Sequence, residues 1–357
     1  MKNVRVAIAG ASGYAGAELV RLAALHPHFD LHAVTSEKSA GVPVATVFPS
    51  LAGLVSLSFQ ALSPEALAEQ ADAVFLALPH TKSLEPVSAC LKTGKLVVDL
   101  SADYRLTDPA VYEQWYNTPH TYPDLLKNAV YGLPELHRAA IAKARLVASP
   151  GCYPTAAVLQ LAPLFARDLV QPHTVVIDAK SGVSGAGRSP ALPYHFPEAH
   201  ESVEAYKVGQ HRHIPEIEQE LGGLQRRASQ PMKAVTSEPI ITFTPHLVPM
   251  NRGILSTAYC RLKSPMALPD LRHLYQAFYQ GERFVRIQED IMPNPRYIKG
   301  SNYCDIGIYL DPRSGSVITV AALDNLVKGA AGQAIQAMNL MLGLPEETGL
   351  TAPAAYP

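Results

Sequence analysis

The sequence predicts an α/β protein of two domains: a doubly wound sheet first, then an α+β domain with a largely antiparallel sheet. Its 357 residues suffice for about two domains. The first half alternates strand and helix patterns, which is typical of a parallel sheet covered on both faces. The second half is rich in strands instead. We place the boundary near residue 150, with a C-terminal helix over residues 326–345 completing the first domain.

Composition and charge argue against several classes of protein, among them those that bind nucleic acid, membranes or zinc. A net charge of −1 gives no electrostatic basis for binding nucleic acid or an anionic membrane surface. Four widely separated cysteines favour neither a disulfide framework nor a zinc site. No apolar run approaches 18 residues, and the chain reads as a strand from Val4 without a signal-peptide pattern. We therefore expect a cytoplasmic protein that binds no nucleic acid, membrane or metal.

The first strand, residues 4–9, leads directly into GASGYAG at 10–16 and a helix over 15–26. This is the start of a Rossmann-like dinucleotide-binding unit: Gly10 permits the tight turn, Gly13 lets the backbone approach a pyrophosphate, and Gly16 allows close helix–strand packing. The spacing is GxxGxxG rather than GxGxxG, so a glycine-rich turn without a ligand is the alternative. The residues expected to contact the cofactor here are Gly10, Ser12, Gly13, Tyr14 and Gly16.

The second strand, residues 31–35, indicates which dinucleotide is bound. A carboxylate at its end would bind the ribose 2′-OH of NAD. This strand is followed instead by Ser36 and Lys38, which suit a 2′-phosphate, so we predict NADP(H). Glu37 opposes this prediction unless it faces solvent. Pro79, after the strand at 73–78, should also face the cofactor.

The strand at 96–100 is followed by SADYR at 101–105. Asp103 and Arg105 form a structural ion pair, or Arg105 binds an anionic group of a substrate; the sequence leaves both open. Residues 107–137 show no clear periodicity and predict an ordered loop.

The centre of the chain is SPGCYPT at 149–155, between a strand at 144–148 and a helix at 155–168. Pro154 fits the first turn of that helix. Cys152 therefore lies at or just before the helix N-terminus, where unpaired amides and the macrodipole favour a thiolate. A buried structural cysteine is the alternative.

Two more motifs follow in the second half. KSGVSGAGR at 180–188, after a strand at 174–179, is either a backbone nest for an anion or a surface loop. In HRHIPEI at 211–217, Pro215 begins a helix, and a histidine fixed before it suits general acid–base chemistry. We predict no metal at this histidine pair, because neither Cys nor carboxylate partners lie at ligand spacing.

The remaining patterns complete the second sheet. Strands are predicted over 240–245, 253–262, 284–287, 303–310 and 316–322, with helices over 268–279 and 330–342. We expect Cys90, Cys260 and Cys304 to pack inside, and the tail from Glu346 to lie on the surface.

Together these motifs resemble the N-acetyl-γ-glutamyl-phosphate reductase family, the arginine-pathway branch of the semialdehyde dehydrogenases. The resemblance spans nearly the whole chain and includes YGLPE at 131–135, VPMNRGIL at 248–255 and DNLVKGAAGQA at 324–334. It implies a cysteine nucleophile at Cys152 and a histidine acid/base at His211 rather than His213. It also implies NADPH on the glycine turn and Asn325 at the nicotinamide.

The resemblance implies reduction of an acyl phosphate through a Cys152 thioester, with release of inorganic phosphate. The thiohemiacetal oxyanion would be stabilised by His211 as an imidazolium or by the Cys152 N–H. A homodimer or homotetramer is expected. Further expected cofactor contacts are Ser181 and Gly182, and the expected substrate contacts are Ser101, Arg105, Arg188, Arg212 and Glu216.

Three alternatives remain open at this point. One is a sibling reductase that acts on a carrier-linked aminoadipyl or glutamyl phosphate, although the net charge of −1 argues mildly against a protein-borne substrate. Aspartyl-phosphate reduction is less favoured, because HRHIPEI is unlike that branch. The third is a non-catalytic NADP-binding sensor, which would need neither Cys152 nor His211.

Overall fold

The computed structural model describes residues 3–171, 173–228 and 238–356. The chain divides into two compact units. Unit 1 comprises Met1–Gly151 and Ala330–Ala352, and unit 2 comprises Cys152–Gly329 and Pro353–Pro357. Unit 1 contains a parallel sheet and unit 2 a mixed one, so the predicted α/β class is confirmed.

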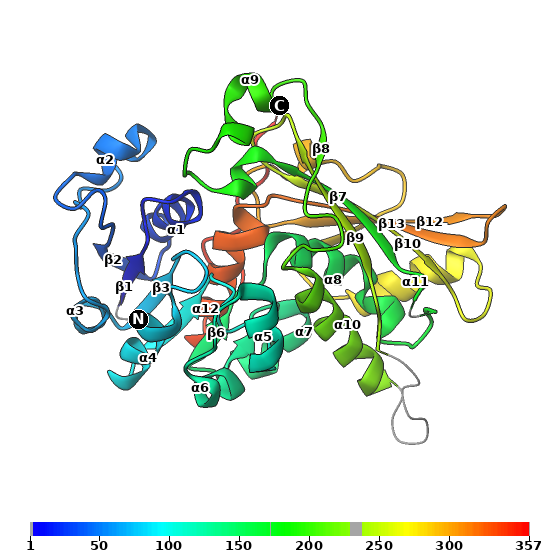
Figure 1. Cartoon of the computed structure of the whole chain (residues 1–357), viewed down its shortest axis with the longest axis horizontal. Helices are drawn as coiled ribbons and strands as arrows, with labels where there is room; N and C mark the ends of the chain where they lie inside the picture. Colours follow the sequence, from blue (N-terminus) through cyan, green and yellow to red (C-terminus); the bar gives the residue numbers. More distant parts are fainter. Residues whose placement is uncertain (1–2, 172, 229–237, 357) are drawn as a thin grey trace. The chain divides into compact units, whose positions relative to one another are not determined.

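The sheet of unit 1 has the order β2-β1-β3-β4-β6-β5, and every pairing in it is parallel (Figure 1). Its strands are short and almost wholly apolar, as expected where helices cover both faces. They are β1 (Val4–Ala9), β2 (Phe29–Val34), β3 (Ala73–Leu76), β4 (Leu96–Asp99), β5 (Val130–Tyr131) and β6 (Leu146–Ala148).

Two groups of helices bury the faces of this sheet. One group is α1 (Tyr14–Ala24), α12 (Gly332–Met341) and α7 (Pro134–Ile141), which pack against one another. The other is α3 (Pro64–Glu69) and α4 (Leu84–Lys92), whose apolar side chains join β1, β3 and β4 in one core cluster. Ser63 caps α3 by accepting a hydrogen bond from the Ala66 N–H. The short α2 (Val44–Val47) follows β2.

The prediction of a loop over residues 107–137 is wrong. This segment forms α5 (Pro109–Tyr116), α6 (Pro123–Asn128), β5 and the start of α7. Each of these helices begins with a proline, which is pre-organised for the first turn. Helices of two turns are too short to show a clear period, and buried rings such as Tyr112 stabilise them instead.

The sheet of unit 2 has the order β11-β12-β13-β10-β7-β9-β8. Within the described residues four pairings are antiparallel, whereas β11–β12 and β7–β9 are parallel. The strands are β7 (Val176–Gly182), β8 (Glu204–Ala205), β9 (Thr242–Val248), β10 (Ile254–Arg261), β11 (Val285–Gln288), β12 (Cys304–Asp311) and β13 (Ser316–Leu323).

Three helices pack on one face of this sheet: α8 (Cys152–Phe165), α10 (Ile214–Ala228) and α11 (Leu268–Phe278) (Figure 1). Along β10, side chains alternate between buried on that side and partly or fully exposed on the other, so the second face stays open. Strand β7 runs to Gly182, so residues 180–182 are strand and not loop; a short 3₁₀ turn, Val183–Ala186, follows.

The C-terminal segment is less exposed than predicted. Leu350 is buried, and Glu346 forms an ion pair with Arg138 of α7 at 2.8 Å. The sequence pattern missed this because isolated contacts leave no periodic signal. In the part of the chain that the structure describes, no helix has the length and apolar character needed to span a membrane.

Candidate active site

The three glycines of the turn between β1 and α1 differ in how closely other atoms approach them. Gly10 has a left-handed backbone (φ +73°), and a Cβ on it would lie 2.4 Å from the carbonyl oxygen of Ala77. A Cβ on Gly16 would lie 2.6 Å from Ala11 Cα. For Gly13 the nearest atom would be 3.7 Å away. The fold therefore requires Gly10 and Gly16, whereas Gly13 leaves open space at the helix start.

The N-cap residue of α1 has no side chain to cap the backbone amides of the first turn. Gly13 is the N-cap, and the first turn, which begins at Tyr14, contains no acidic residue. Ser12 Oγ lies 2.8 Å from Ser36 Oγ, which joins the turn to the end of β2. Lys38 is exposed two residues further on. This arrangement suits an anion at the positive end of α1.

Buried carboxylates organise the ends of β3 and β4. Thr81, two residues after the exposed Pro79, has a left-handed backbone (φ +70°) and donates its N–H to Asp103 at 2.7 Å. The Ser101 hydroxyl donates to Asp99 at 2.6 Å, and burial raises the pKa of Asp99 to about 6. Since Ser101 is fully buried with its hydroxyl so engaged, its predicted contact with substrate stays a prediction.

Asp103 and Arg105 both make hydrogen bonds to backbone groups. Asp103 accepts from two backbone N–H groups and from a tyrosine hydroxyl. Arg105 is buried and donates to the carbonyl oxygens of Ser149 and Leu100, each at 2.7 Å. It therefore ties the end of β4 to the segment that leads into Cys152. Its predicted role as an anion ligand stays a prediction.

Cys152 is the first residue of α8, at the positive end of that helix. Gly329 packs directly on it, because a Cβ on Gly329 would lie 2.8 Å from Cys152 Cβ. Cys90, Cys260 and Cys304 are buried, as predicted, whereas Cys152 is only partly buried. Burial raises the pKa of Cys90 to about 11 and of Cys260 to about 12. The accessible thiol is thus the one whose setting favours a thiolate.

His211 lies three residues before α10 begins. Its Nδ1 accepts a hydrogen bond from the His213 N–H at 3.2 Å, so the neutral ring carries its proton on Nε2. Burial lowers the pKa of His211 to about 4, with further lowering from the cations Lys207 and Arg212. The free chain therefore presents a neutral Nε2–H donor, not the imidazolium.

Two tyrosines pack against the ring of His211. Tyr153, next to Cys152, places its ring centroid 5.6 Å from that of His211, and so does Tyr206. The Tyr206 hydroxyl donates to the Tyr153 hydroxyl at 3.2 Å. Burial, with a smaller contribution from Cys152, raises the pKa of Tyr206 to about 12. Tyr153 and Tyr206 thus both contact the His211 ring, and both are close to Cys152: Tyr153 follows it in the sequence, and Tyr206 is affected by its charge. Tyr206 was missed because it lies in a stretch without a motif.

The predicted cofactor residues of unit 2 form a bonded cluster. Asn325 Oδ1 accepts from the Gly253 N–H at 2.6 Å, and its Nδ2 donates to Ser184 Oγ at 3.0 Å. Ser181 is buried, and its hydroxyl bonds the Gly182 carbonyl oxygen at 3.0 Å. A Cβ on Gly182 would lie 2.8 Å from the backbone of the segment after β9. Each residue thus has a structural role, and contact with a cofactor stays a prediction.

Basic residues gather beside His211. The positive charges of Arg212 and Lys207 lower the pKa of His211. Lys207 also has a left-handed backbone (φ +47°), which is strained for a lysine. The sequence motifs did not indicate Lys207. Arg188 is exposed, whereas Glu216 is buried in the first turn of α10. Throughout the described ranges, no group of three or more His, Cys, Asp or Glu side chains is placed to hold a metal.

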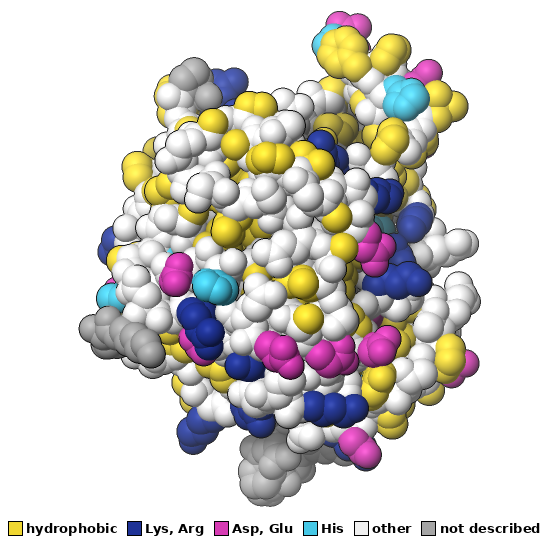
Figure 2. Space-filling model, turned by 90° about the vertical axis from the view of Figure 1, so that its left-hand side faces the viewer, with side chains coloured by type: hydrophobic (Ala, Val, Ile, Leu, Met, Phe, Trp, Pro, Cys, Tyr) yellow, Lys and Arg dark blue, Asp and Glu magenta, His cyan; other side chains and the backbone are white. Residues whose placement is uncertain are grey.

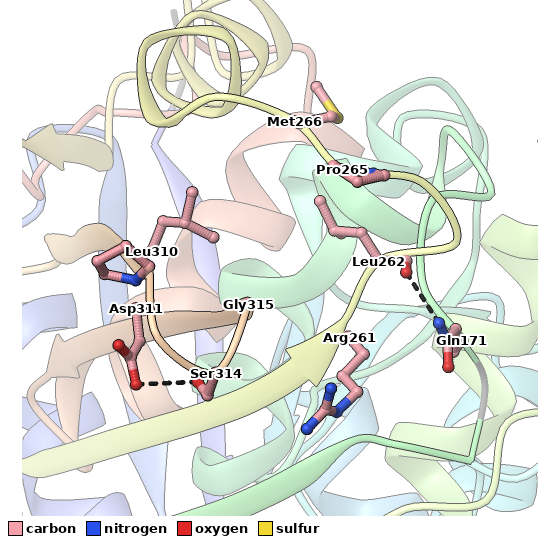
Figure 3. Close-up of a pocket in the computed structure, with 10 residues that line it drawn as sticks. Gln171, Arg261, Leu262, Pro265, Met266, Leu310, Asp311, Ser314 and Gly315 are labelled. Carbon is pink, nitrogen blue, oxygen red and sulfur yellow. Dashed lines mark hydrogen bonds between the residues drawn. The ribbon is translucent and has the colours of Figure 1, made fainter.

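A pocket of about 240 Å³ in unit 2 is separate from this cluster (Figure 3). It is lined by Arg261 at the end of β10 and by the β12–β13 hairpin, where the Ser314 hydroxyl donates to Asp311 at 2.9 Å. The Asn325 cluster holds Gly253, just before β10 begins. The eight residues of β10 place these two ends roughly 25 Å apart.

Comparison with known proteins gives the family. The model for the semialdehyde dehydrogenase NAD binding domain matches residues 5–144, and that for the semialdehyde dehydrogenase dimerisation domain matches 152–325. The N-acetyl-gamma-glutamyl-phosphate reductase of Citrifermentans bemidjiense is 52% identical over 99% of this chain and 100% of its own length. That of Heliobacterium modesticaldum is 50% identical over equal shares. The chain belongs to the N-acetyl-γ-glutamyl-phosphate reductases of the semialdehyde dehydrogenase family.

Solved structures agree on the fold. Aspartate semialdehyde dehydrogenase II of Vibrio cholerae, in complex with ASA, superposes with a TM-score of 0.70 at 16% identity over 96% of this chain and 99% of that one. The enzyme of Candida albicans, solved with NADP, gives the same TM-score, identity and coverage. At this identity the likeness shows the fold alone.

These findings confirm the family predicted from the motifs and the presence of an NAD(P)-binding domain. They also show a domain of the dimerising type in the second half of the chain. The roles of individual residues stay predictions.

Proposed function

We propose that this chain reduces N-acetyl-γ-glutamyl phosphate with NADPH, giving N-acetylglutamate 5-semialdehyde and inorganic phosphate in arginine biosynthesis. The observation that carries the proposal is Cys152 at the start of α8, whose neighbours Tyr153 and Tyr206 also contact His211. Relatives half-identical over their full length bear the name of this reaction. The four cysteines are free thiols, which fits the reducing cytoplasm.

Unit 1 fits the dinucleotide. We assign residues 1–150, completed by the helix at 326–345, to cofactor binding and residues 151–325 to catalysis and oligomerisation. The glycine N-cap of α1 and the open space at Gly13 suit a pyrophosphate. Ser36 and Lys38, at the end of β2, would hold the 2′-phosphate. When bound, the nicotinamide supplies hydride, and Pro79, Ser181, Gly182 and Asn325 are the further residues proposed to position it.

Cys152 supplies the nucleophile. Its thiolate attacks the γ-acyl carbon, the bond to the phosphate oxygen breaks, and a thioester forms. Phosphate leaves with the electron pair of that bond and takes up a proton from solvent. After reduction of the thioester carbonyl, the carbon–sulfur bond breaks, which releases the aldehyde and regenerates the thiolate.

His211 stabilises the charge that develops on the carbonyl oxygen. Its neutral ring offers Nε2–H, and the backbone N–H groups at the start of α8 offer further donors. A donor aimed at such an oxyanion contributes roughly 3–4 kcal/mol. This role needs no positive charge on His211.

The anionic groups of the substrate need cations. Lys207 and Arg212 lie close enough to His211 to lower its pKa, so a phosphate beside the imidazole would meet both. Arg188 and Arg105 are further candidates for phosphate or carboxylate, and Ser101 and Glu216 are proposed to position the substrate.

A second copy of the chain completes the assembly as a homodimer or homotetramer. Val176 and Tyr259 are 39% and 41% exposed on the open face of the unit 2 sheet. Leu192, Phe196 and Val203 are 66%, 73% and 65% exposed in the segment around α9 (Phe196–Ala199). Figure 2 shows hydrophobic and histidine side chains gathered on the projection at the top of the view, the position of α9 in Figure 1. Apolar patches of this kind mark protein interfaces.

The reverse reaction tests the proposal. Purified protein is given N-acetylglutamate 5-semialdehyde, NADP⁺ and phosphate, and NADPH is followed by absorbance. We expect reduction that depends on phosphate and is faster with NADP⁺ than with NAD⁺. Cys152→Ala serves as the control for adventitious reduction.

Two results would overturn the proposal. Faster turnover of aspartate semialdehyde or of a carrier-linked substrate would move the chain to a sibling reaction. NADP binding without any phosphate-dependent turnover would make it a sensor.

A further inference from the structure

The His211 imidazole is enclosed by four rings, which we call the ring box: Tyr153, Tyr206, His213 and Phe243. Their centroids lie 5.6, 5.6, 4.7 and 5.4 Å from that of His211, all in edge-to-face geometry. The rings come from α8, from the segment after β8, from the residues before α10 and from β9. Edge-to-face contacts of this kind fix ring orientation and exclude water from one side of the imidazole.

The two tyrosines of the ring box are joined through their hydroxyls. Tyr206 donates to Tyr153 at 3.2 Å, and Tyr153 donates to the His246 carbonyl oxygen on β9 at 3.3 Å. Tyr206 is also anchored through its backbone N–H, which donates to the Pro245 carbonyl oxygen at 3.1 Å. Since Tyr153 is bonded to Cys152, this chain of hydrogen bonds links the backbone at the candidate nucleophile to one wall of the histidine site.

We propose that Tyr153 and Tyr206 are positioning residues. The hydrogen bond between their hydroxyls fixes the ring box, and the ring box holds the Nε2–H of His211 in a constant position relative to Cys152. The assignment rests on the proposed function for the role of His211 in the reaction. The box itself can be measured without substrate. The tyrosines touch neither reacting atoms nor cofactor in this account and act through His211.

The cations that act on His211 oppose its protonation, and the two tyrosines of the ring box are neutral. Lys207 and Arg212 carry positive charge, Tyr153 and Tyr206 keep their protons because burial raises their pKa, and His213 donates its backbone N–H to Nδ1. Removing a ring admits water, which weakens the largest of the effects that lower the pKa of His211. Removing only a hydroxyl keeps the ring and leaves that effect in place.

The test separates the ring of Tyr206 from its hydroxyl. Tyr206→Phe and Tyr206→Ala are compared with wild type, and Tyr297→Phe, at a tyrosine that is 42% exposed, is the matched control. Steady-state kinetics give kcat and KM between pH 5 and 9, and NMR of histidine-labelled protein gives the titration of His211. Thermal unfolding checks that each variant is folded.

Tyr206→Phe should lower kcat on the order of tenfold with KM for the acyl phosphate nearly unchanged, because the imidazole loses its fixed position. Its His211 should still titrate near pH 4. Tyr206→Ala should raise the His211 midpoint by about one pH unit. Tyr153→Phe should resemble Tyr206→Phe, and Tyr297→Phe should match wild type in every readout.

A purely structural role gives a different pattern. If both Tyr206 variants only lower the melting temperature, while kcat per folded site and the His211 midpoint match wild type, the proposal is overturned. If the wild-type chain reduces no acyl phosphate but Tyr206→Ala still moves the His211 titration, the box is supported and only the proposed function fails.

Discussion

The glycine turn of unit 1 and the ring box of unit 2 are encoded in opposite ways. The turn is a run of consecutive residues, Gly10 to Gly16, in which two glycines meet the backbone of the turn itself or of the residue that follows β3. The ring box takes its members from positions 153 to 243, which only the folded sheet and helices bring together. A pattern of neighbouring residues therefore reveals the glycine turn but not the ring box. Both are proposed to surround groups that take part in the reaction.

The glycine turn and the ring box should also differ in how well they tolerate substitutions. At Gly10 and Gly16 of the turn, a single added methyl group would lie within 3 Å of backbone atoms. In the ring box, side chains meet side chains, and loss of one hydroxyl should weaken positioning without unfolding the unit. The predictions below test this contrast, beginning with the largest effect.

Cys152→Ala should lower kcat by on the order of 10⁴-fold or more, because the thioester can no longer form. Cys260→Ala, which removes a buried thiol of the same unit, is the matched control and should keep its turnover. Steady-state assays of both variants check this. Turnover of Cys152→Ala within tenfold of wild type would exclude the covalent route.

His211→Gln should lower kcat on the order of 10²-fold, since the oxyanion loses a donor. The pH profile carries a second test. Burial and two cations lower the pKa of His211 to about 4, so the neutral form persists as the pH falls from 8 to about 5. No loss of kcat/KM in that range should trace to this residue. A wild-type inflection near pH 6.5 that disappears in His211→Gln would contradict the assignment.

Gly16→Ala should destabilise the chain by about 1–3 kcal/mol, because its Cβ would lie 2.6 Å from Ala11 Cα. Gly13→Ala is its control within the same turn, where the nearest atom is 3.7 Å away. That variant should keep its melting temperature but raise KM for NADPH. Chemical denaturation and cofactor kinetics separate the two. Equal losses of stability in Gly16→Ala and Gly13→Ala would contradict the proposed difference between these two glycines.

Lys38→Ala should give the smallest effect, about a tenfold rise in KM for NADPH, equivalent to 1.4 kcal/mol. KM for NADH should not change, because NADH lacks the 2′-phosphate that Lys38 is proposed to bind. The ratio of the two KM values is the measurement. An unchanged ratio would place the 2′-phosphate elsewhere.

The sequence was sufficient for features that depend on neighbouring residues. The β1–α1 turn and the start of α10 after His211 follow from local spacing, and the longer strands of both sheets lie close to their predicted positions, whereas the two-residue strands β5 and β8 were not predicted. The short helices of residues 109–141 were not foreseen, because one or two turns carry no period and depend on contacts such as the buried Tyr112.

Features that depend on distant contacts could not be derived in the same way. Arg105 donates to two backbone carbonyls, and no side-chain pattern reveals such contacts. Lys207 and Tyr206 lie in a stretch without a motif and become candidates only through their position beside His211. The low pKa of His211 likewise follows from burial that only the folded chain provides.

The central claim is that Cys152 carries the acyl group between phosphate release and reduction. Its most direct test mixes enzyme, NADP⁺ and N-acetylglutamate 5-semialdehyde without phosphate and follows NADPH in a rapid-mixing instrument. The quenched sample is then digested, and its peptides are analysed by mass spectrometry. A rapid burst approaching one NADPH per chain is predicted, together with an N-acetylglutamyl adduct on the peptide that contains Cys152. Continuous turnover should begin only when phosphate is added. Steady NADPH formation without a burst, or an unmodified Cys152 peptide, would contradict the account.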